Sequence, residues 1–499
     1  MKQIIESIIN EITMYRLVLY GLLVVAVFAG MLSMFGVLQV SPLSLIASGL
    51  TLVAVSYGSS RLFARLFSTH HNRESWAITG LILFFLLPPP TSLKEVLAIG
   101  FVALLATASK YIVAVRQRHI FNPAAIAVVI AGLFNIVHAS WWVATPLLLP
   151  VVAIVGLLIV WKVRRFAMVG IYIFVAMLVA VFVCMVSGYN LSEELSILIL
   201  SSPLIFVATI MLTEPLTSPT TRKWQLIYAA VVGALTTWQL GLVFTPEIAI
   251  CIGNLIAFAV GYRRAIKLKI VAIRTIAPST IEVIARPLHP VSFVAGQYME
   301  LTLPHKHADA RGVRRTFSIA SAPSDDSVRF GLTVSEPGSS FKKELTHLNK
   351  GRIIRATQIG GDFSLPQDPT KPLVFIAGGI GITPFRAMLA DLMARGEHRN
   401  IVLFYATRTK EVQVYNDVIQ EAKKILNILY VPVVAKPHET WKGETGFITA
   451  EMIHKHVSDV KKRRIYISGP SLMVDNLRSQ LLKNGIRHSQ IVKDYFSGY

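Results

Sequence analysis

Cysteine is the scarcest reactive residue in this chain. Only two cysteines occur among its 499 residues, Cys184 and Cys251, and both lie inside apolar runs. Two thiols can build neither a disulfide framework nor a cluster held by four thiolates, so this chain alone supplies no iron–sulfur centre. Any one-electron chemistry therefore needs another carrier.

Acidic residues are also sparse in the first half. No aspartate precedes Asp309, and the glutamates there lie in loops or at the ends of apolar segments: Glu74, Glu95, Glu193, Glu194, Glu214 and Glu247. Ion pumps often place a carboxylate in mid-membrane, so this pattern argues against a cation-translocating function without excluding it.

Histidine is missing from the middle of the same apolar segments. The histidines of this half stand near the ends of predicted helices: His70, His71, His119 and His138. They leave no pair for axial haem ligation within a bilayer, which argues against the haem-containing transmembrane ferric reductases and NADPH oxidases.

Apolar residues dominate instead. The hydrophobic fraction is 53% and the mean hydropathy is +0.57, which is too apolar for a wholly soluble chain of this length. The formal net charge of +21 is typical of a membrane protein whose Lys and Arg mark its cytoplasmic loops, so we expect no nucleic-acid partner.

Residues 1–262 are predicted to be a transmembrane electron-transfer domain. Apolar segments long enough to cross roughly 30 Å of hydrocarbon recur along it, and we expect about ten spans. They fall near residues 17–39, 43–60, 76–90, 92–108, 121–137, 143–161, 166–187, 195–212, 225–244 and 247–261. Lys2 and Arg16 precede the first of them without a small-residue cleavage site, so we expect an uncleaved span.

Basic residues predict the topology. With a cytoplasmic N-terminus, these residues all fall inside: Arg61, Arg65, Arg73, Lys110, Arg116, Arg118, Lys162, Arg164, Arg165, Arg222, Lys223, Arg263, Arg264, Lys267 and Lys269. This is the asymmetry that the positive-inside rule requires. We therefore expect a multi-pass protein of the cell membrane whose N-terminus and C-terminal half are cytosolic.

Three stretches of the membrane half carry a resemblance. They read TGLILFFLLPPP at 79–90, FNPAA at 121–125 and TEPLTSPTT at 213–221. In order and spacing over about 75–261 they resemble the family formed by the flavin-carrying membrane subunits of the sodium-translocating NADH:quinone reductase and of the Rnf complex. In that family a Thr in a Ser-Gly-Ala-Thr-Pro-Leu context on the outer face carries FMN through a phosphoester.

The corresponding position here is Thr145, in Ala144-Thr145-Pro146-Leu147. The Ala-Thr-Pro-Leu part matches, whereas the Ser-Gly part and a preceding Asp are absent. The resemblance implies a second flavin at this place, covalent or not, or a quinone. The alternative is that Trp141 and Trp142 form an interfacial aromatic belt and Thr145 only starts a helix.

Asn122, Glu214 and Thr217 are the other candidate cofactor residues of this half. One interpretation is a helix that starts with Pro123 in its first turn, followed later by a Pro/Thr-rich turn. The other is that polar helix ends line a cofactor cavity, because irregular backbone at membrane depth is tolerated only where protein or water satisfies it. Agreement with the family favours the cavity.

Residues 265–368 are predicted to be an FAD-binding β-barrel domain. Short alternating apolar segments such as 281–285, 298–303 and 328–334 indicate antiparallel strands. Within them Arg315-Thr316-Phe317-Ser318 resembles the Arg-x-Tyr/Phe-Ser motif of the ferredoxin–NADP reductase superfamily.

The resemblance assigns Arg315 to the FAD pyrophosphate, Phe317 to the isoalloxazine face and Ser318 to the flavin N5 edge. An arginine matches a phosphate bidentately and an aromatic ring stacks on a planar heterocycle. Further family matches are Gly338-Ser339-Ser340, a second phosphate-binding turn at a helix start, Tyr298 after Gly296-Gln297, and Gly361-Asp362-Phe363.

Residues 370–499 are predicted to be an NAD(P)-binding α/β domain with a parallel sheet. A buried strand at 373–377 precedes the turn Gly378-Gly379-Ile380-Gly381-Ile382-Thr383-Pro384 and a helix that ends near Gly396. We expect Thr383 to cap this helix and Pro384 to take its first position, so that free N–H groups face a pyrophosphate.

Two later matches support the nucleotide site. They are Arg408 after Tyr405-Ala406-Thr407, and Ser468-Gly469-Pro470 with Met473. The resemblance places them at the adenosine and nicotinamide sides, with Ser468 where a Cys is common. Arg408 and Lys410 either hold a 2′-phosphate or are solvated, which leaves NADH and NADPH both open.

The C-terminal residues 494–499 resemble family members whose last aromatic residues approach the flavin, with an edge strand as the alternative. Ser318, Ser468 and Tyr499 are thus the candidate catalytic residues. The predicted function is electron transfer from NAD(P)H through FAD to a membrane flavin or quinone, and on to a quinone or extracytosolic acceptor. The alternatives are a redox-coupled sodium or proton transporter, and a reductase merely anchored in the bilayer.

Overall fold

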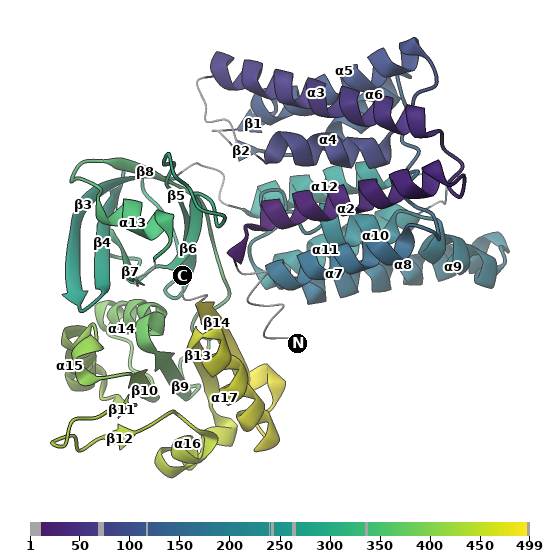
Figure 1. Ribbon diagram of the computed structural model, residues 1–499. Helices are drawn as coiled ribbons and strands as arrows, with labels where there is room; N and C mark the ends of the chain where they lie inside the picture. Colours follow the sequence, from purple (N-terminus) through teal and green to yellow (C-terminus); the bar gives the residue numbers. More distant parts are fainter. Residues whose placement is uncertain are drawn as a thin grey trace. The chain divides into compact units, whose positions relative to one another are not determined.

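The chain divides into two compact units, residues 1–264 and 265–499. A computed structural model describes residues 11–67, 74–115, 118–238, 240, 244–261, 266–334 and 338–496. Figure 1 shows a helical first unit and a mixed second unit.

The first unit is built of helices joined by short turns. Its elements are α2 (Met14–Met34), α3 (Pro42–Leu66), α4 (Ser75–Leu86), α5 (Leu93–Ile112), β1 (Ala114–Val115), β2 (Arg118–His119), α6 (Pro123–Leu133), α7 (Leu149–Val163), α8 (Phe166–Ser187), α9 (Leu191–Leu200), α10 (Leu204–Phe206), the π-helix η1 (Val207–Met211), α11 (Arg222–Thr237) and α12 (Pro246–Val260).

Four of these helices, α2, α3, α5 and α8, are long and apolar enough to cross a membrane. The pair formed by α9 and α10–η1 adds a fifth if its 51° bend is counted as one broken span. Each of the ten predicted segments contains a helix, but α4, α6, α7 and α12 are shorter apolar helices. Proline sets some of these limits, because Pro88 to Pro90 follow α4 and Pro123 opens α6.

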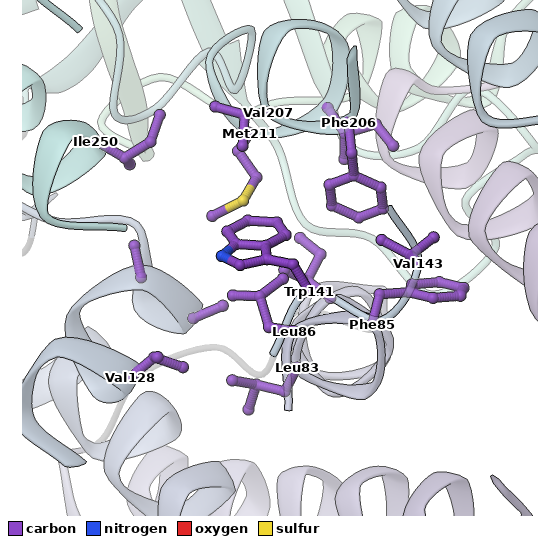
Figure 2. Close-up of a cluster of buried hydrophobic side chains, with 14 of the residues drawn as sticks. Leu83, Phe85, Leu86, Val128, Trp141, Val143, Phe206, Val207, Met211 and Ile250 are labelled. Atoms are coloured by element: carbon purple, nitrogen blue, oxygen red, sulfur yellow. The ribbon is translucent and has the colours of Figure 1, made fainter. Parts of the chain in front are cut away.

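Trp141 lies at the centre of the apolar core of the first unit (Figure 2). It is 8% exposed, and its ring stands edge-on to Phe206 at a centroid distance of 6.0 Å. Its Nε1 donates to the buried Glu247 carboxylate at 3.2 Å. Trp142 is half-buried and donates to the Phe84 carbonyl at 2.5 Å. The interfacial-belt interpretation is therefore wrong for Trp141, because the core takes its ring and a carboxylate takes its N–H.

The second unit starts with a six-stranded antiparallel sheet that curls into a barrel (Figure 1). Its strands are β3 (Ile266–Ala277), β4 (Thr280–Pro287), β5 (Tyr298–Thr302), β6 (Arg314–Ser318), β7 (Val328–Thr333) and β8 (Ile353–Gly360), in the order β6-β5-β8-β3-β4-β7. The Ala320 N–H donates to Arg329 O at 2.8 Å and links the two outer strands. Helix α13 (Ser340–Thr346) lies between β7 and β8 in sequence.

A six-stranded parallel sheet completes this unit, in the order β12-β11-β10-β9-β13-β14. Its strands are β9 (Leu373–Gly378), β10 (Ile401–Thr407), β11 (Leu429–Val434), β12 (Glu444–Thr445), β13 (Arg464–Pro470) and β14 (Ile491–Phe496). Its helices and turns are η2 (Gly379–Ile382), α14 (Thr383–Arg395), η3 (Lys410–Val412), α15 (Asn416–Leu426), α16 (Ala450–His456), η4 (Val460–Lys462), α17 (Ser471–Lys483) and η5 (His488–Gln490).

The strand order places β9 at a switch point. The chain runs outward from β9 through β10 and β11, then returns to pair β13 with the other side of β9. In open parallel sheets, ligands bind outside the carboxyl ends of the strands at such a point. Every residue of β9 is buried, as the apolar run at 373–377 predicted.

The barrel and the parallel sheet pack closely within this unit. Arg386 of α14 is 9% exposed and donates to the Ala320 carbonyl, just beyond β6. Its guanidinium carbon lies 5.2 Å from the centre of the Tyr415 ring. The end of the β6 strand is thus bound to the helix that follows the glycine-rich turn.

Candidate functional site

Ser318 and Asp494 join the two sheets at the end of β6. The Ser318 hydroxyl donates to Asp494 Oδ2 at 3.1 Å, across 176 residues of sequence. Ser318 is 5% exposed, and Asp494 is the register partner of Ser468 on the neighbouring strand. Two of the three predicted catalytic residues therefore meet beside one carboxylate.

The pKa of the Asp494 carboxyl group lies above its ordinary value in this position. Burial raises its pKa to about 6, against the opposing effect of the hydrogen bonds from Ser318 and the Tyr495 N–H. An ionised Asp494 engages the single Ser318 proton, so that Ser318 Oγ is only an acceptor toward a ligand. A protonated Asp494 is itself a donor. The pair can therefore hold or release one proton beside Ser318 Oγ near neutral pH.

Asp494 was not singled out from the sequence. The signal was present, since it is the single acidic residue in the last segment and alternates with Tyr495 along a strand. The Tyr495 hydroxyl instead donates to Asp475 of α17 at 3.0 Å. The edge-strand interpretation is confirmed for residues 494–496, which lie in the edge strand β14, whereas residues 497–499, with Tyr499, lie outside the described residues.

Arg315 and the turn before α13 converge on one anion. Arg315 Nη2 lies 3.5 Å from Asp309 Oδ1, and the Ser340 N–H donates to Asp309 Oδ2 at 2.9 Å. Burial alone would raise the pKa of Asp309, but hydrogen bonds from the Ser340 and Arg311 N–H groups and the charge of Arg315 hold it below its usual value. Asp309 is thus the carboxylate that Arg315 and the turn before α13 share.

Lys342 adds to the positive charge around this anion. It is 7% exposed, and burial, with the charges of Arg315 and Arg311, lowers its pKa to about 8. Arg315 and Arg311 act on the Asp309 carboxylate, and Lys342 adds a third cation beside these two arginines, which leaves an excess of positive charge that suits a pyrophosphate. The donors present therefore fit the phosphates of FAD, with Asp309 as their internal partner in this structure. Gly338 and Ser339 precede α13, and Ser339 caps it by accepting from the Lys342 N–H.

The remaining barrel residues surround the end of β6. Phe317 is 8% exposed and packs against Phe341 and Phe330, at ring distances of 5.9 and 6.4 Å. Thr316 is exposed, and Tyr298 is the register partner of Ser318. Stacking of Phe317 on a flavin ring stays a prediction.

The glycine-rich turn meets the end of β13. A Cβ on Gly378 would lie 2.3 Å from Met473 Sδ, and one on Gly381 would lie 2.3 Å from the Ser468 carbonyl oxygen. The Gly469 Cβ position is 3.2 Å from the Gly378 backbone, and Pro470 ends β13. The predicted nucleotide residues are thus assembled at the carboxyl ends of β9 and β13. Arg408 is exposed after β10, the next strand of that edge.

Two details of the turn differ from expectation. Thr383 does not cap α14 but is its first residue, and its hydroxyl donates to the Ile380 carbonyl at 3.0 Å. The reason is that η2 runs directly into α14, so that helical geometry starts before Thr383, and Pro384 falls one position later. Gly379 has φ +55°, a conformation that favours glycine.

Ser468 carries a buried hydroxyl that fits a bound nucleotide. The residue is 0% exposed, and its Oγ has no hydrogen-bond partner among the residues that the structure describes. Buried hydroxyls normally have a hydrogen-bond partner. A buried hydroxyl without one, at a glycine-lined turn, is a group to which a ligand can form a hydrogen bond. Its position beside Asp494 is consistent with the nicotinamide side.

The helical unit gathers three other predicted residues. Asn122 Nδ2 donates to Glu214 Oε2 at 2.9 Å, and the Thr217 hydroxyl donates to the same oxygen at 3.0 Å. Asn254, which the sequence did not single out, accepts from the Asn122 N–H at 2.7 Å and donates to the Thr217 carbonyl at 3.0 Å. Thr145 is half-buried elsewhere and accepts from the Leu148 N–H at 3.3 Å, which closes the turn before α7.

Comparisons with known proteins bear on the second unit. The family model "Oxidoreductase NAD-binding domain" matches residues 375–479. Ferredoxin–NADP reductase B of Sorangium cellulosum is 30% identical over 188 residues, 37% of this chain and 75% of that protein. The NAD(P)H-flavin reductase of Vibrio harveyi is 25% identical over 226 residues, 44% of this chain and 92% of that protein.

Two further matches differ in how much of the relative's length they cover. CDP-6-deoxy-L-threo-D-glycero-4-hexulose-3-dehydrase reductase of Yersinia pestis is 27% identical over 42% of this chain, which spans 61% of that protein's length. A ferredoxin NADP+ reductase structure from Neisseria gonorrhoeae is 22% identical over 47% of this chain and 99% of its own, with a TM-score of 0.40.

The fold and site define an FAD- and NAD(P)H-dependent oxidoreductase. The flavin, when bound, supplies the conversion between hydride transfer and single-electron transfer. The second unit has two sheets, with an anion site on one and a glycine-rich turn on the other. Through its C-terminal unit, the chain belongs to the ferredoxin–NADP reductase family.

Replacing Asp494 tests the buried proton site. In the unchanged protein about a tenth of the Asp494 side chains are ionised at pH 5 if the pKa is about 6. We expect flavin reduction by NAD(P)H at pH 5 to run at about a tenth of its plateau rate above pH 7. Asp494→Asn should flatten this profile and Asp494→Glu should retain it, in stopped-flow measurements from pH 5 to 8. An unchanged profile in Asp494→Asn would contradict the assignment.

Asp309→Ala tests whether this carboxylate competes with phosphate. Removing it frees Arg315 and the Ser340 N–H, so we expect FAD to bind the apoprotein about tenfold more tightly. Asp326→Ala removes an exposed carboxylate of the same barrel and should leave the affinity unchanged. Quenching of FAD fluorescence measures both. Weaker binding in Asp309→Ala would mean that Asp309 organises the site instead of occupying it.

Gly381→Ala tests the close approach in the nucleotide turn. The new methyl group would collide with the Ser468 backbone, so we expect the KM for NAD(P)H to rise at least about tenfold while bound FAD is retained. Gly396→Ala is the control, because its Cβ meets nothing within 4 Å and only its φ of +62° is strained. It should lower stability by about 1 kcal/mol and leave KM unchanged. Equal KM values in the two variants would refute the steric argument.

Proposed function

We propose that the chain is a membrane-bound flavoprotein that carries electrons from cytosolic NAD(P)H, by way of FAD, into its helical unit. The helical unit then relays them to a quinone or to an acceptor beyond the outer face. The observation that carries this proposal is that one polypeptide joins a reductase unit to a unit with four or five helices able to span a membrane.

Named residues have defined tasks in the reductase unit. The turn around Gly378, Gly379 and Gly381 holds the nucleotide, while Ser468 and Gly469 line its nicotinamide side. Arg315, assisted by Lys342, holds the flavin phosphates. Ser318 and Asp494 hold or release a proton beside the reacting edge.

A second redox group in the helical unit is part of this proposal. Roughly 30 Å of hydrocarbon is too far for transfer from a cytosolic flavin alone, so the relay needs a carrier within the bilayer. Resemblance to the flavin-carrying membrane subunits of the sodium-translocating NADH:quinone reductase and of the Rnf complex suggests FMN, bound through Thr145 or held without a covalent bond. The Asn122–Glu214–Thr217 cluster and the broken α9–η1 pair are features of a unit that accommodates a cofactor among helix ends.

The positive-inside topology belongs to the same proposal. The N-terminus and the reductase unit are placed in the cytosol, with about ten crossings in all, the shorter helices α4, α6, α7 and α12 included. This arrangement loads electrons from the cytosol and releases them at the opposite face or into the quinone pool.

A redox-coupled cation transporter is the second candidate function. The observation that favours it is Glu247, a carboxylate that is 5% exposed in the apolar core and bonded to Trp141. Buried carboxylates among membrane helices are frequent in ion pathways. A reductase that is only anchored by its helices is the remaining possibility.

Flavin analysis of the purified full-length protein tests the relay. Acid precipitation should release FAD into the supernatant. A second flavin should either appear there as well or stay attached to the pellet. Thr145→Val should remove an attached flavin, whereas Thr91→Val, an exposed threonine in a different loop, should not. FAD as the only flavin would overturn the relay and leave the anchored reductase. Turnover that depends on sodium in sealed vesicles would favour the transporter.

A further inference from the structure

A basic hollow lies at the amino-terminal edge of the parallel sheet. It has a volume of about 550 Å³, and six Lys or Arg residues line it together with Gly485, Ser489 and Gln490. The six are Lys371, Lys461, Lys462, Arg463, Arg464 and Arg487. They come from the start of β9, from η4, from the start of β13 and from the turn that follows α17.

The hollow is distinct from the nucleotide site. Strands β9, β13 and β14 are parallel, so their amino ends share one edge and the glycine-rich turn lies at the other. The six residues of β9 separate the two edges by about 17–20 Å. The hydride donor cannot reach from one to the other.

The charge of the hollow is almost uncompensated. Within the described part of the chain, Arg463 is the only one of the six with a carboxylate at salt-bridge distance, Asp459 at 2.7 Å. Arg464 Nε is buried without a hydrogen-bond partner among those residues. Residues 265–499 carry 33 Lys and Arg against 20 Asp and Glu, a net charge of +13. Like charges gathered in one concavity repel unless an anion enters.

The backbone around the hollow is fixed. Gln490 Nε2 donates to the carbonyls of Lys461 and Arg463, at 2.7 and 3.1 Å, and its Oε1 accepts from the Arg487 N–H at 3.0 Å. Gly485 has φ +82°, and the Lys461 ammonium lies 3.7 Å from its Cβ position. Because this backbone is already ordered, ligand binding costs only the freedom of the cationic side chains.

We propose that this hollow binds two or more phosphate groups at once. Guanidinium and ammonium groups from separate segments match several phosphate oxygens at once, and the volume accommodates a small polyphosphate. The phosphates come either from a soluble molecule or from the headgroups of anionic lipids, which attract basic surfaces close to a membrane. The site would let cytosolic phosphate compounds or membrane composition act on the reductase unit away from its electron path.

The test uses the full-length protein in phosphatidylcholine nanodiscs, titrated with pyrophosphate by calorimetry at low salt. We expect saturable binding that weakens with salt and falls at least about tenfold in Lys461→Gln/Arg464→Gln/Arg487→Gln. Lys350→Gln/Lys423→Gln/Lys424→Gln removes the same charge from exposed positions outside the hollow and should bind normally. NAD(P)H oxidation and thermal melting check that each variant is folded. If the triple variant does not fold, Lys461→Glu/Lys462→Glu, two exposed positions, replaces it.

Nanodiscs that contain phosphatidylglycerol separate the two sources of phosphate. If lipid headgroups occupy the hollow, pyrophosphate binding is lost in these discs and returns when they are made of phosphatidylcholine. If a soluble compound is the ligand, binding is equal in both. The proposal is overturned if pyrophosphate shows no saturable binding in phosphatidylcholine, or if both triple variants lose affinity equally, since the effect would then reflect net charge alone.

Discussion

The hydrogen bond between Ser318 and Asp494 holds the reductase unit together where its two sheets meet. Ser318 ends a barrel strand, and Asp494 lies on the edge strand of the parallel sheet beside Ser468. Burial makes the pair costly unless each partner is satisfied, and it brings the Asp494 pKa to about 6. This contact therefore joins the end of β6 to the edge strand of the parallel sheet and places a titrating group between the two sheets.

The anion site is likewise built from charged and polar groups that contact one another. Arg315 and the Ser340 N–H share the Asp309 carboxylate, which offsets part of the positive charge of this cluster. The helical unit shows a comparable arrangement, in which Asn122, Glu214, Thr217 and Asn254 form hydrogen bonds with one another.

Local pattern predicted much of this architecture. Alternating apolar residues indicated strands β4, β5 and β7, the apolar run indicated β9, and Gly396 ends α14 as expected. The glycine-rich turn and Ser468 were found by motif, and the structure brings them together. Asp494, Asp309 and Lys342 were missed, because their partners are distant in sequence and their roles depend on burial. The prediction that Thr383 caps α14 was wrong, because the 3-10 helix η2 runs directly into α14 and moves the start of helical geometry.

The sequence by itself determined the division of the chain, since hydropathy, charge and strand period depend only on neighbouring residues. The sequence also determined which side chains can bind phosphate or stack on an aromatic ring. Only the tertiary structure decided which of them meet. Burial of Trp141 against Glu247, the sharing of one anion by Arg315 and Ser340, and the basic hollow at the edge of the parallel sheet all join segments far apart in the chain. Distance and solvent exclusion, which set the strength of such contacts, are properties of the fold.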